Sequence, residues 1–516
     1  MSKFSCFSDH RFWVGSLAVI NVFIHLTFFD TLGFHRDELL YFSLGQHLSA
    51  GYASVPPFTG FIAWIVINTM GYSLFAVRLI PALLSGVYLL LGAGIARELK
   101  GGKYAQVLTA AGIIVTPLNL RSFYLFMPVF FDVFFWSLFL YFILRWINSR
   151  ENRYLILSGI TAGMALMNKY LILLLIVSVV ITFLFSSYRS VFRNRSFYIA
   201  LLLSLLIFLP NIIWQVVHDF PVLVHMQALQ DNQLVHVDPL AFFTDQLFMG
   251  TMASILILPG VVFGIAGKDR KPYLPLMIAS LMVIFVLAIL RGKSYYTAGL
   301  IPFWVASGAV FWERIIHNRA GKVILAVFMV LLTIPILPMG IPVFRHDKLK
   351  EYFAGARKIT GIDMMLRWES GKIHPLPQDY ADMLGWDEIA LLTYKAYLQI
   401  PDKHAAMIFA ENYGEAGAVM VLGKHYGLPE PACLSESFFY WFPRNPNREI
   451  TSLIYINEDD MGEDVKEIFA DIRVIGQVTN PLAREYGARV SLCTHPRRSF
   501  NQFLRERIPL VKTPFE

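Results

Sequence analysis

The strongest constraint on this chain is a series of apolar runs, each about as long as a bilayer is thick. A spanning helix needs about 20 predominantly apolar residues, and such runs recur from Phe12 to about Pro342. Only 16% of the residues are charged and 56% are hydrophobic, whereas a soluble protein carries about 25% charge. These values exclude a disordered or collagen-like chain. We therefore predict an α-helical polytopic membrane domain, residues 1–342, with eleven spans at 12–29, 77–96, 104–120, 129–147, 154–168, 171–187, 197–217, 248–266, 273–290, 299–316 and 323–342.

The lysines and arginines of residues 1–342 are distributed unevenly between the two sides of this predicted domain. Loops rich in Lys and Arg stay on the cytoplasmic side, and one set of loops holds seventeen of them while the other holds six. The six are Arg36, Arg78, Arg121, Lys169, Arg291 and Lys293. With eleven spans, the cation-poor loops and residues 343–516 lie outside the cytoplasm. Because the net charge of +7 comes from the membrane part, it gives no support to nucleic acid as a partner.

The N-terminus and the cysteines each allow two interpretations. Lys3 and Arg11 before an apolar run resemble a signal peptide, but no small-residue cleavage site follows, so we expect an uncleaved first span. Cys433 and Cys493 can form a disulfide if residues 343–516 are exported. Their apolar neighbours favour two buried free thiols at least as strongly.

Two outer segments are unusual. Residues 30–76 form a long amphipathic loop, whose parts Asp37–Ala50 and Phe58–Met70 are typical of helices lying in the interface plane. Residues 218–247 contain no Lys or Arg but three histidines and four aspartates. They lack the close His spacing of a zinc site, so no cofactor is expected with certainty and a divalent metal is a secondary expectation.

From about residue 343 the pattern changes to that of a soluble α/β domain, residues 343–516. Short apolar runs predict buried strands, and amphipathic runs between them predict helices, which together indicate a small three-layer domain. The predicted strands are 405–409, 452–456, 474–478 and 490–493, and the predicted helices are 386–399, 415–426 and 463–472.

Two adjacent carboxylates open the first outer loop, in the run FHRDELLYFSLGQHL that begins at residue 34. Asp37 and Glu38 lie at a predicted helix start, where the helix dipole stabilises acids, so capping is one interpretation. A catalytic base with His35 or Arg36 as its charge partner is the other. Because neighbouring helical residues point about 100° apart, Asp37 and Glu38 cannot face one substrate atom equally.

Two further places on the outer side carry charge. Asp132 is a lone acid in an apolar span, which indicates either a functional carboxylate or a hydrogen-bonded anchor between helices. The turn RGKSYY begins at Arg291 and places two cations before Tyr295 and Tyr296. This turn suits either a phosphate at the bilayer surface or contacts with lipid headgroups.

Arg121 and Lys169 are more typical of interfacial than of catalytic residues. No Walker loop and no dinucleotide fingerprint occur in the sequence. This argues against a machine driven by nucleotide hydrolysis.

Several of these motifs occur together in one known family. The run FHRDELLYFSLGQHLSAGYASVPPFTGFIAWI resembles the first extracytoplasmic loop of glycosyltransferase family 39-like membrane proteins. These are relatives of the dolichyl-phosphate-mannose protein mannosyltransferases and have the GT-C fold. The resemblance continues in PVFFDVFFW, SGITAGMALMNKY, RGKSYYTAGLIPFWVASGA, DMLGWDEIA and FAENYGEAGAVMVLGKHYGLP. It covers nearly the whole chain and is greatest for a bacterial branch with a periplasmic α/β tail.

The resemblance implies an enzyme that transfers a sugar from a polyprenyl-phosphate carrier to an acceptor on the outer face of the bacterial inner membrane, with inversion. It implies Asp37 as the catalytic base, with Glu38 and Asp132 as further acidic residues of the site. The implied substrate-binding residues are His35, Arg36, Tyr41, Arg121, Lys169, Arg291, Lys293, Tyr295 and Tyr296. The implied partners are the lipid-linked donor, an envelope glycan, lipid or protein as acceptor, and the bilayer.

The chain departs from the lipid A aminoarabinose transferases, which have a Glu shortly before their Pro-Pro. Here Ser54 and Val55 precede Pro56, so neither a metal site of that kind nor lipid A as acceptor carries over. A transporter or flippase of lipid-linked sugars is the alternative function, and a non-catalytic scaffold is a third. The Asp-Glu loop and the lack of inverted repeats favour the enzyme.

The charge asymmetry makes a prediction about topology. A reporter that is active only outside the cytoplasm should be active when it is fused after Glu516, because loops rich in Lys and Arg stay inside. The same reporter inserted after Arg193, in a cation-rich loop, is the control and should be silent. Labelling of the C-terminus from the cytoplasm would overturn this orientation.

Overall fold

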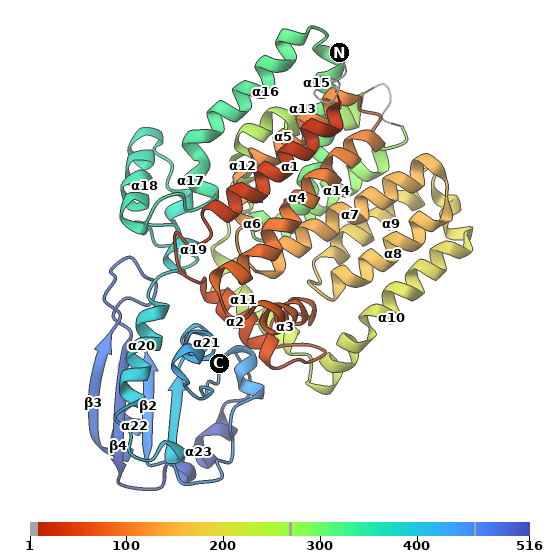
Figure 1. The fold of residues 1–516 in the computed structure, drawn as a ribbon. Helices are drawn as coiled ribbons and strands as arrows, with labels where there is room; N and C mark the ends of the chain where they lie inside the picture. The colour runs from red at the N-terminus through yellow and green to blue at the C-terminus, as the bar shows by residue number, and fades with distance from the viewer. Residues whose placement is uncertain (1–8, 268–270, 459–460, 516) are drawn as a thin grey trace. The chain divides into compact units, whose positions relative to one another are not determined.

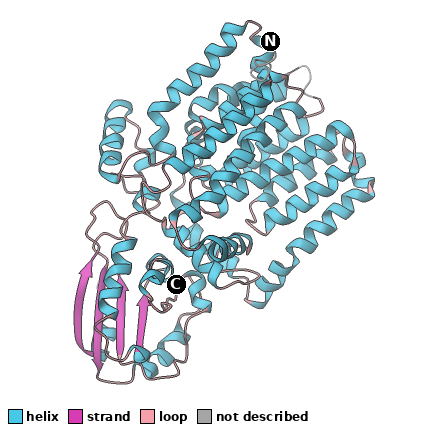
Figure 2. Ribbon diagram, viewed as in Figure 1, coloured by secondary structure: helices cyan, strands magenta, loops and turns pink. Residues whose placement is uncertain are grey.

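The computed structural model describes residues 9–267, 271–458 and 461–515, and most of them are helical (Figure 1). Within these residues the named strands form one four-stranded sheet (Figure 2). By its internal contacts the chain divides into two compact units, which we describe separately. Unit 1 is Met1–Phe29, Arg78–Trp214 and Leu234–Val343, and unit 2 is Asp30–Val77, Gln215–Gln233 and Phe344–Glu516.

The two units differ from the predicted division of the chain after residue 342. A boundary does fall at Val343. However, the first outer loop and part of the second outer segment belong to unit 2, together with the C-terminal residues. The physical reason is that α2 (Arg36–Gln46), in the first loop, packs on α21 (Tyr413–Val421). Hydropathy along the chain reports local periodicity, so it contains no signal for packing between segments this far apart.

Unit 1 consists of apolar helices with short connections. Its α-helices are α1 (His10–Thr27), α4 (Leu74–Glu98), α5 (Lys103–Ile114), α6 (Pro117–Ser122), α7 (Pro128–Ser149), α8 (Asn152–Leu166), α9 (Ile172–Leu184), α10 (Arg195–Val217), α12 (Pro239–Gly250), α13 (Ser254–Ala266), α14 (Leu274–Ile289), α15 (Ile301–Ile315), α16 (Arg319–Thr333) and α17 (Leu337–Gly340). Its 3₁₀ turns are η2 (Arg189–Arg193), η3 (Leu234–His236), η4 (Thr251–Ala253), η5 (Ser294–Leu300) and η6 (Ile334–Ile336). Helices α4 and α10 each cross a unit boundary.

All the predicted spans coincide with helical structure. Among the described residues, five helical stretches are long and apolar enough to cross a membrane, namely Leu74–Glu98, Pro128–Ser149, Arg195–Val217, Pro239–Ala266 and Arg319–Gly340. Shorter apolar helices include Ile172–Leu184 and Leu274–Ile289. These helices support a multi-pass membrane protein, whereas the count of eleven spans stays a prediction.

Close packing in unit 1 depends on small residues. A Cβ at Gly308 of α15 would lie 1.9 Å from the carbonyl oxygen of Leu256 in α13. A Cβ at Gly159 of α8 would lie 2.3 Å from the carbonyl oxygen of Ala200 in α10. Small residues at helix interfaces let backbones approach in a membrane, where lipid is as apolar as a side chain and gives no hydrophobic driving force.

Unit 2 contains the sheet and the remaining helices. Its α-helices are α2, α3 (Phe58–Met70), α11 (Pro221–Asn232), α18 (His346–Thr360), α19 (Gln378–Ala381), α20 (Trp386–Tyr397), α21, α22 (Glu463–Ile468) and α23 (Phe500–Arg507). Its strands are β1 (Ala406–Ala410), β2 (Ser452–Asn457), β3 (Phe469–Gln477) and β4 (Arg489–Pro496). Its 3₁₀ turns are η7 (Met364–Leu366), η8 (Lys403–Ala405), η9 (Gly423–Tyr426), η10 (Glu436–Tyr440) and η11 (Ile508–Leu510).

The sheet has the strand order β1-β2-β4-β3. Strand β1 runs parallel to β2, and β4 runs antiparallel to both of its neighbours. Side chains of alternate residues, such as Leu453 and Tyr455, pack with Phe500 and Phe503 of α23 on one face. Helices α20 and α21 contact the sheet as well, and α20 runs along it in Figure 1. Each predicted strand overlaps one of these four strands, but the prediction that all four are buried is wrong for β3, whose side chains are mostly exposed.

One predicted helix is wrong over its second half. Residues 463–472 were expected to be helical, but α22 ends at Ile468 and β3 begins at Phe469. Strand β3 pairs with the edge of β4, with Ile472 opposite Cys493. The backbone hydrogen bonds offered by that edge outweigh the local helical pattern, because β propensity depends on context.

The cysteines of unit 2 do not form a disulfide. Cys433 and Cys493 are both free and buried. Of the two interpretations of the sequence, that of two buried free thiols is confirmed.

Helix α2 is covered by neighbours along its length. Leu39, Phe42 and Leu44 are all fully buried. Helix α3 approaches at Gly45, where a Cβ would lie 2.8 Å from the backbone nitrogen of Trp64. Helix α2 is therefore not the one-sided interfacial helix that its pattern suggested. Helix α3 keeps an exposed apolar face, so its interfacial placement stays a prediction.

The contact between α2 and α21 makes a prediction about stability. A Cβ at Gly417 of α21 would lie 2.8 Å from Cβ of Leu39 and 3.1 Å from its carbonyl carbon. We expect Gly417→Ala to destabilise the protein by about 1–3 kcal/mol, because overpacking forces the two helices apart. The measurement is thermal unfolding of the purified protein in detergent.

Gly355→Ala in α18 is the matched control, because a Cβ there meets nothing within 4 Å. It should be neutral or stabilising by up to about 1 kcal/mol, since alanine is the better helix former. Equal unfolding temperatures for the two variants would contradict the packing described here.

Candidate active site

The N-termini of helices α2 and α21 in unit 2 lie close together. Each starts with a capping box, formed by His35 and Glu38 in α2 and by Asn412 and Glu415 in α21. Asp37 is the second residue of α2 and Tyr413 is the first residue of α21. The Tyr413 hydroxyl donates a hydrogen bond of 2.9 Å to Oδ1 of Asp37. The first turns of two helices therefore meet at this carboxylate.

Arg36 lies against the same tyrosine. Its guanidinium carbon is 4.2 Å from the centroid of the Tyr413 ring. Burial raises the pKa of Tyr413 well above its ordinary value, and the charge of Asp37 adds to the effect. The hydroxyl therefore keeps its proton and acts as a donor. A Cβ at Gly414 would lie 2.8 Å from Cγ of Arg36, so this glycine makes room for the arginine.

The structure assigns different tasks to the residues on either side of Asp37. Oε2 of Glu38 accepts the backbone N–H of His35 at 2.9 Å, and the side chain of Glu38 is fully buried. The capping interpretation is thus confirmed for Glu38. The Asp37 side chain is instead partly exposed and bonded to Tyr413. The expectation that the two acids face different surroundings is confirmed.

His35 is also part of the helix start. Its Nδ1 accepts the backbone N–H of Asp37 at 3.0 Å, so a neutral ring carries its proton on Nε2. Nε2 lies 3.8 Å from the carboxylate of Asp382. With 3% of its surface exposed, His35 orients the chain around Asp37, and its predicted role in substrate binding gains no support from this placement.

Asp382 connects this helix start to the C-terminal residues. Its carbonyl accepts the backbone N–H of Arg36 at 2.9 Å, and its carboxylate lies 3.3 Å from Arg484. Burial raises the pKa of Asp382, while His35, Arg484 and Arg36 oppose that effect. Asp382 and Tyr413 were not singled out in the sequence, although they lie in DMLGWDEIA and FAENYGEAGAVMVLGKHYGLP. Those two motifs are the signal that could have found them.

A second carboxylate, also missed in the sequence, belongs to the surroundings of Asp37. Tyr41, one turn after Asp37 and buried, interacts electrostatically with Asp37, Tyr413 and Glu436. Burial raises the pKa of Glu436 to about 7 and the charge of Asp37 adds to this, against a hydrogen bond from Ser54 and the charge of Arg36.

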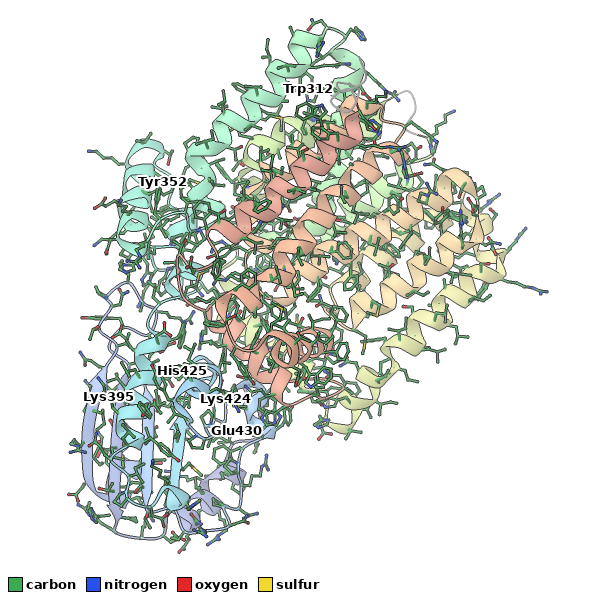
Figure 3. The ribbon with its side chains drawn as sticks, viewed as in Figure 1. Trp312, Tyr352, Lys395, Lys424, His425 and Glu430 are labelled. Atoms are coloured by element: carbon green, nitrogen blue, oxygen red, sulfur yellow. The ribbon has the colours of Figure 1, made fainter. Side chains whose placement is uncertain are left out.

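The other end of α2 is also attached to C-terminal residues. The side-chain amide of Gln46 donates to the carbonyl of Met420 at 3.4 Å. The ring of His47 stacks on Trp441 with centroids 4.1 Å apart, and Nε2 lies 3.4 Å from Glu430, which Figure 3 labels. Burial lowers the pKa of His47, with Glu430 opposing and Lys424 adding to the effect. Both ends of α2 are thereby fixed.

Unit 1 brings together predicted residues from three separate segments. Asp132 of α7 is 6% exposed, and its Oδ1 accepts from the indole nitrogen of Trp136 at 3.0 Å. Lys169 interacts electrostatically with Asp132. Its ammonium lies 4.5 Å from the ring centroid of Tyr296 and 5.5 Å from that of Tyr295. Residues 132, 169 and 295–296 thus form one cluster, here called the Lys169 cluster.

The turn that carries Tyr295 and Tyr296 is held against α7. Ser137 donates a hydrogen bond of 3.0 Å to the carbonyl of Gly299. A Cβ at Gly299 would lie 2.4 Å from Cβ of Trp136, so the approach requires glycine. Lys293 is the N-cap of η5 and is partly exposed.

The remaining two predicted cations have other contacts. Arg291 is exposed, has a φ of 54°, and donates to the carbonyl of Val235 at 3.2 Å. Arg121 of α6 donates to the carbonyl of Met339 at 3.5 Å. Both of these contacts are with backbone carbonyls outside the Lys169 cluster.

The described residues do not form a recognisable metal-binding site. The described residues include no group of three or more His, Cys, Asp or Glu side chains arranged to hold a metal ion. In the second outer segment, His218 packs edge-on against Tyr440 and His225 lies against Phe515. A divalent metal stays an untested expectation.

Comparison with known protein families bears on what this chain does. Residues 54–214 match the family model described as dolichyl-phosphate-mannose-protein mannosyltransferase. Over these residues the resemblance stated from the sequence is confirmed. The matched range includes Asp132 and Lys169 but not Asp37 or the turn at residues 291–296. It supports the prediction that the chain is a glycosyltransferase, and the sugar that this chain transfers stays unspecified. No curated protein matches the chain.

Solved structures share the fold. ArnT from Cupriavidus metallidurans bound to undecaprenyl phosphate is 13% identical, with a TM-score of 0.61 over 93% of this chain and 97% of that one. The apo state of the same protein is also 13% identical, with a TM-score of 0.60 over 93% of this chain and 97% of that one. Archaeal oligosaccharyltransferase AglB from Archaeoglobus fulgidus, in complex with an inhibitory peptide and a dolichol-phosphate, is 14% identical, with a TM-score of 0.47 over 86% of this chain and 69% of that one. The ArnT likeness shows a common GT-C fold.

The junction of the two helix starts makes a prediction that needs no substrate. Tyr413→Phe keeps the ring under Arg36 and removes only the hydrogen bond to Asp37. Because Asp37 is partly exposed, the loss should be about 1 kcal/mol of unfolding free energy. The measurement is the thermal unfolding temperature in detergent.

Tyr394→Phe is the control, since Tyr394 is in the same unit and its ring stacks on Tyr426. It should unfold within error of the wild type. An unchanged unfolding temperature for Tyr413→Phe would show that the hydrogen bond contributes nothing to the junction.

Proposed function

We propose that this chain transfers a sugar from a polyprenyl-phosphate-linked donor to an acceptor hydroxyl outside the cytoplasm, with inversion at the anomeric carbon. The observation that carries the proposal is the Asp37 carboxylate. It is partly exposed, is held by Tyr413 through one oxygen, and stands where two helices begin. The mannosyltransferase family match supports the reaction class.

The geometry suits Asp37 as the base. A base must hold its carboxylate in a fixed direction and remain charged until the proton arrives. The Tyr413 hydroxyl fixes Oδ1 where the two helices begin, and Arg36 lies against the Tyr413 ring. As the acceptor oxygen bonds to the anomeric carbon, its O–H bond breaks and the proton goes to Asp37. The electron pair of the bond between that carbon and the phosphate oxygen leaves with the lipid phosphate.

The donor phosphate requires cations and apolar surroundings. The turn of unit 1 supplies Lys293 at its start, and the Lys169 cluster supplies a second cation held by two tyrosine rings. Cations placed where the leaving phosphate gains charge lower the barrier to transfer. The fold shared with ArnT, which was solved bound to undecaprenyl phosphate, supports a carrier lipid of that class.

Glu38 and Asp132 then have supporting roles. The carboxylate of Glu38 accepts the backbone N–H of His35 in the capping box, and it thereby holds the start of α2, which carries Asp37, in place. Asp132 balances the charge of Lys169 and is oriented by Trp136. We place the protein in the bacterial inner membrane with residues 343–516 outside the cytoplasm, and its acceptor is an envelope glycan, lipid or protein.

The proposal is tested with purified protein in proteoliposomes and a set of radiolabelled polyprenyl-phosphate hexoses and pentoses. An envelope extract supplies the acceptor, and the release of polyprenyl phosphate is measured. The wild type should consume one of these donors. Failure to consume any of them would contradict the proposed reaction.

Two substitutions should distinguish the role of the catalytic base from that of the donor-binding site, because one should affect turnover and the other donor binding. Asp37→Asn should lower turnover by about 10²–10⁴-fold with a small change in KM, because the basic oxygen matters in the transition state. Lys293→Ala should mainly weaken donor binding, by about ten- to a hundred-fold for one lost charged hydrogen bond.

Asp347→Asn and Lys395→Ala are the controls, since both residues are exposed and lie outside the site. Figure 3 labels Lys395 on α20. Both controls should match the wild type. Near-normal turnover of Asp37→Asn would refute its role as base and turn attention to Asp132.

A further inference from the structure

A cavity lies among the helix ends of unit 1, apart from the residues of the proposed reaction. Its volume is about 450 Å³, within the range of about 300–1,000 Å³ that is usual for ligand pockets. Asn148, which lines it, and Asp132 of the Lys169 cluster lie in the same helix α7. At 1.5 Å per residue they are about 24 Å apart along the helix axis. The cavity is therefore separate from the Lys169 cluster.

The cavity is bordered by positive charge. Among the described residues that line it, three are cationic and none is acidic; the cations are Lys100, Arg150 and Arg314. All three are exposed and belong to the cation-rich loops, which the charge asymmetry predicts to be cytoplasmic. The carboxylate of Glu98, which accepts from the lining residue Asn148, lies 3.0 Å from Arg145 and 3.5 Å from Arg97. Its charge is thus balanced by cations outside the lining.

Two of the lining cations have a backbone conformation that is uncommon outside glycine. The φ angle is 64° at Lys100 and 59° at Arg150, in the left-handed region. Arg150 is also the C-cap of α7, and left-handed residues at helix ends are usually glycine. Its guanidinium carbon lies 5.1 Å from the ring centroid of Trp146 and 4.8 Å from that of Tyr188. The two rings therefore hold an arginine beside the cavity at a position where glycine is the less strained residue.

The walls behind these cations combine apolar side chains with polar groups that already have partners. The apolar lining residues are Leu99, Ile147, Phe263, Met277, Phe303 and Val310. The hydroxyls of Tyr273, Ser307 and Tyr188 donate to backbone carbonyls at 2.9, 2.7 and 2.8 Å. A ligand that fits is therefore anionic where it meets the cations and apolar where it enters the cavity.

We propose that this cavity binds an anionic phospholipid, with its phosphate against Lys100, Arg150 and Arg314 and one acyl chain between the apolar walls. Arginine donates several N–H groups to a phosphate, and lysine adds a compact charge. Basic pockets between membrane helices on the cytoplasmic side are typical sites for anionic lipid head groups. The inference goes beyond the proposed transfer reaction and does not depend on it.

The wild type alone distinguishes an anionic lipid from a zwitterionic one. Purified protein, freed of lipid in detergent, is titrated with phosphatidylglycerol or with phosphatidylcholine of the same acyl chains, and native mass spectrometry counts the bound lipids. The first phosphatidylglycerol should bind at least about ten-fold more tightly, because only this lipid brings a net negative charge to the three cations. Equal affinity for the two lipids would overturn the proposal.

Charge variants locate the site. Lys100→Gln together with Arg150→Gln should weaken binding of the first phosphatidylglycerol by about ten- to a hundred-fold, because charged hydrogen bonds to the phosphate are lost. Arg193→Gln together with Arg319→Gln is the matched control, since it removes the same charge from two exposed residues of the cation-rich loops outside the lining. The control should bind as the wild type does. Equal weakening in both double variants would indicate unspecific attraction and overturn the site.

Two further comparisons guard against a folding defect, which thermal unfolding without lipid would reveal. Lys100→Arg together with Arg150→Lys keeps both charges and should retain most of the binding. Lys100→Gln alone, compared with Arg319→Gln alone, makes the same test if the first double variant does not fold. Loss of binding in the charge-preserving variant with normal unfolding would contradict recognition by charge.

Soluble competitors distinguish a lipid from a free phosphate. Inorganic phosphate and glycerol phosphate carry the anion without an acyl chain, so neither should displace phosphatidylglycerol at an equal concentration. Displacement by either compound would indicate a site for a soluble phosphate and overturn the lipid as its occupant. Because no donor is present in these measurements, their result stands whether or not the wild type catalyses sugar transfer.

Discussion

The hydrogen bond between Tyr413 and Asp37 joins two helix starts whose residues lie 376 positions apart in the chain. Around it, two capping boxes satisfy the first N–H groups of α2 and α21, and Asp382 accepts the backbone N–H of Arg36. A helix start buried without such partners would leave donors unsatisfied. The candidate site of unit 2 therefore exists only because the first outer loop and the C-terminal residues fold as one unit.

The same junction explains the unusual number of charges in a buried place. Arg36 and Arg484 face Asp37, Asp382, Glu436 and Glu485, and burial raises the pKa of the last three. Asp37 differs from them because it is partly exposed and lies at the positive ends of two helices. The three buried acids therefore hold a proton more easily than an exposed carboxyl group does. Pairs of carboxyl groups with divergent environments are typical of acid–base catalysis.

Much of this could be predicted from the sequence because the relevant signals are local. The Asp37–Glu38 pair marks a helix start, and the apolar run Phe58–Met70 matches α3 at both ends. Strands β1, β2 and β4 were found because buried apolar runs are local patterns, whereas β3 is mostly exposed. The site residues at positions 132, 169 and 295–296 were recognised one by one, although nothing local indicated that they form a cluster.

The rest depends on contacts between distant segments. Tyr413, Asp382 and Glu436 gain their chemistry from residues of α2 and from Ser54, so their own neighbours in sequence carry no sign of it. Helix α2 was expected at an interface because its pattern is amphipathic, but α21 and α3 cover it. Residues 469–472 were predicted as helix but belong to strand β3, because the edge of β4 is available for pairing.

Native-state hydrogen exchange on the purified protein in lipid tests most directly whether α2 and α21 form one cooperative element. Amides of residues 39–46 and 416–421 should open with the same free energy, because losing the Asp37–Tyr413 junction exposes both helices in one event. The amide of Arg36, bonded to Asp382, should be protected to the same degree. Fast exchange throughout α2 beside slow exchange in α21, as expected for a helix resting on a lipid surface, would contradict the account.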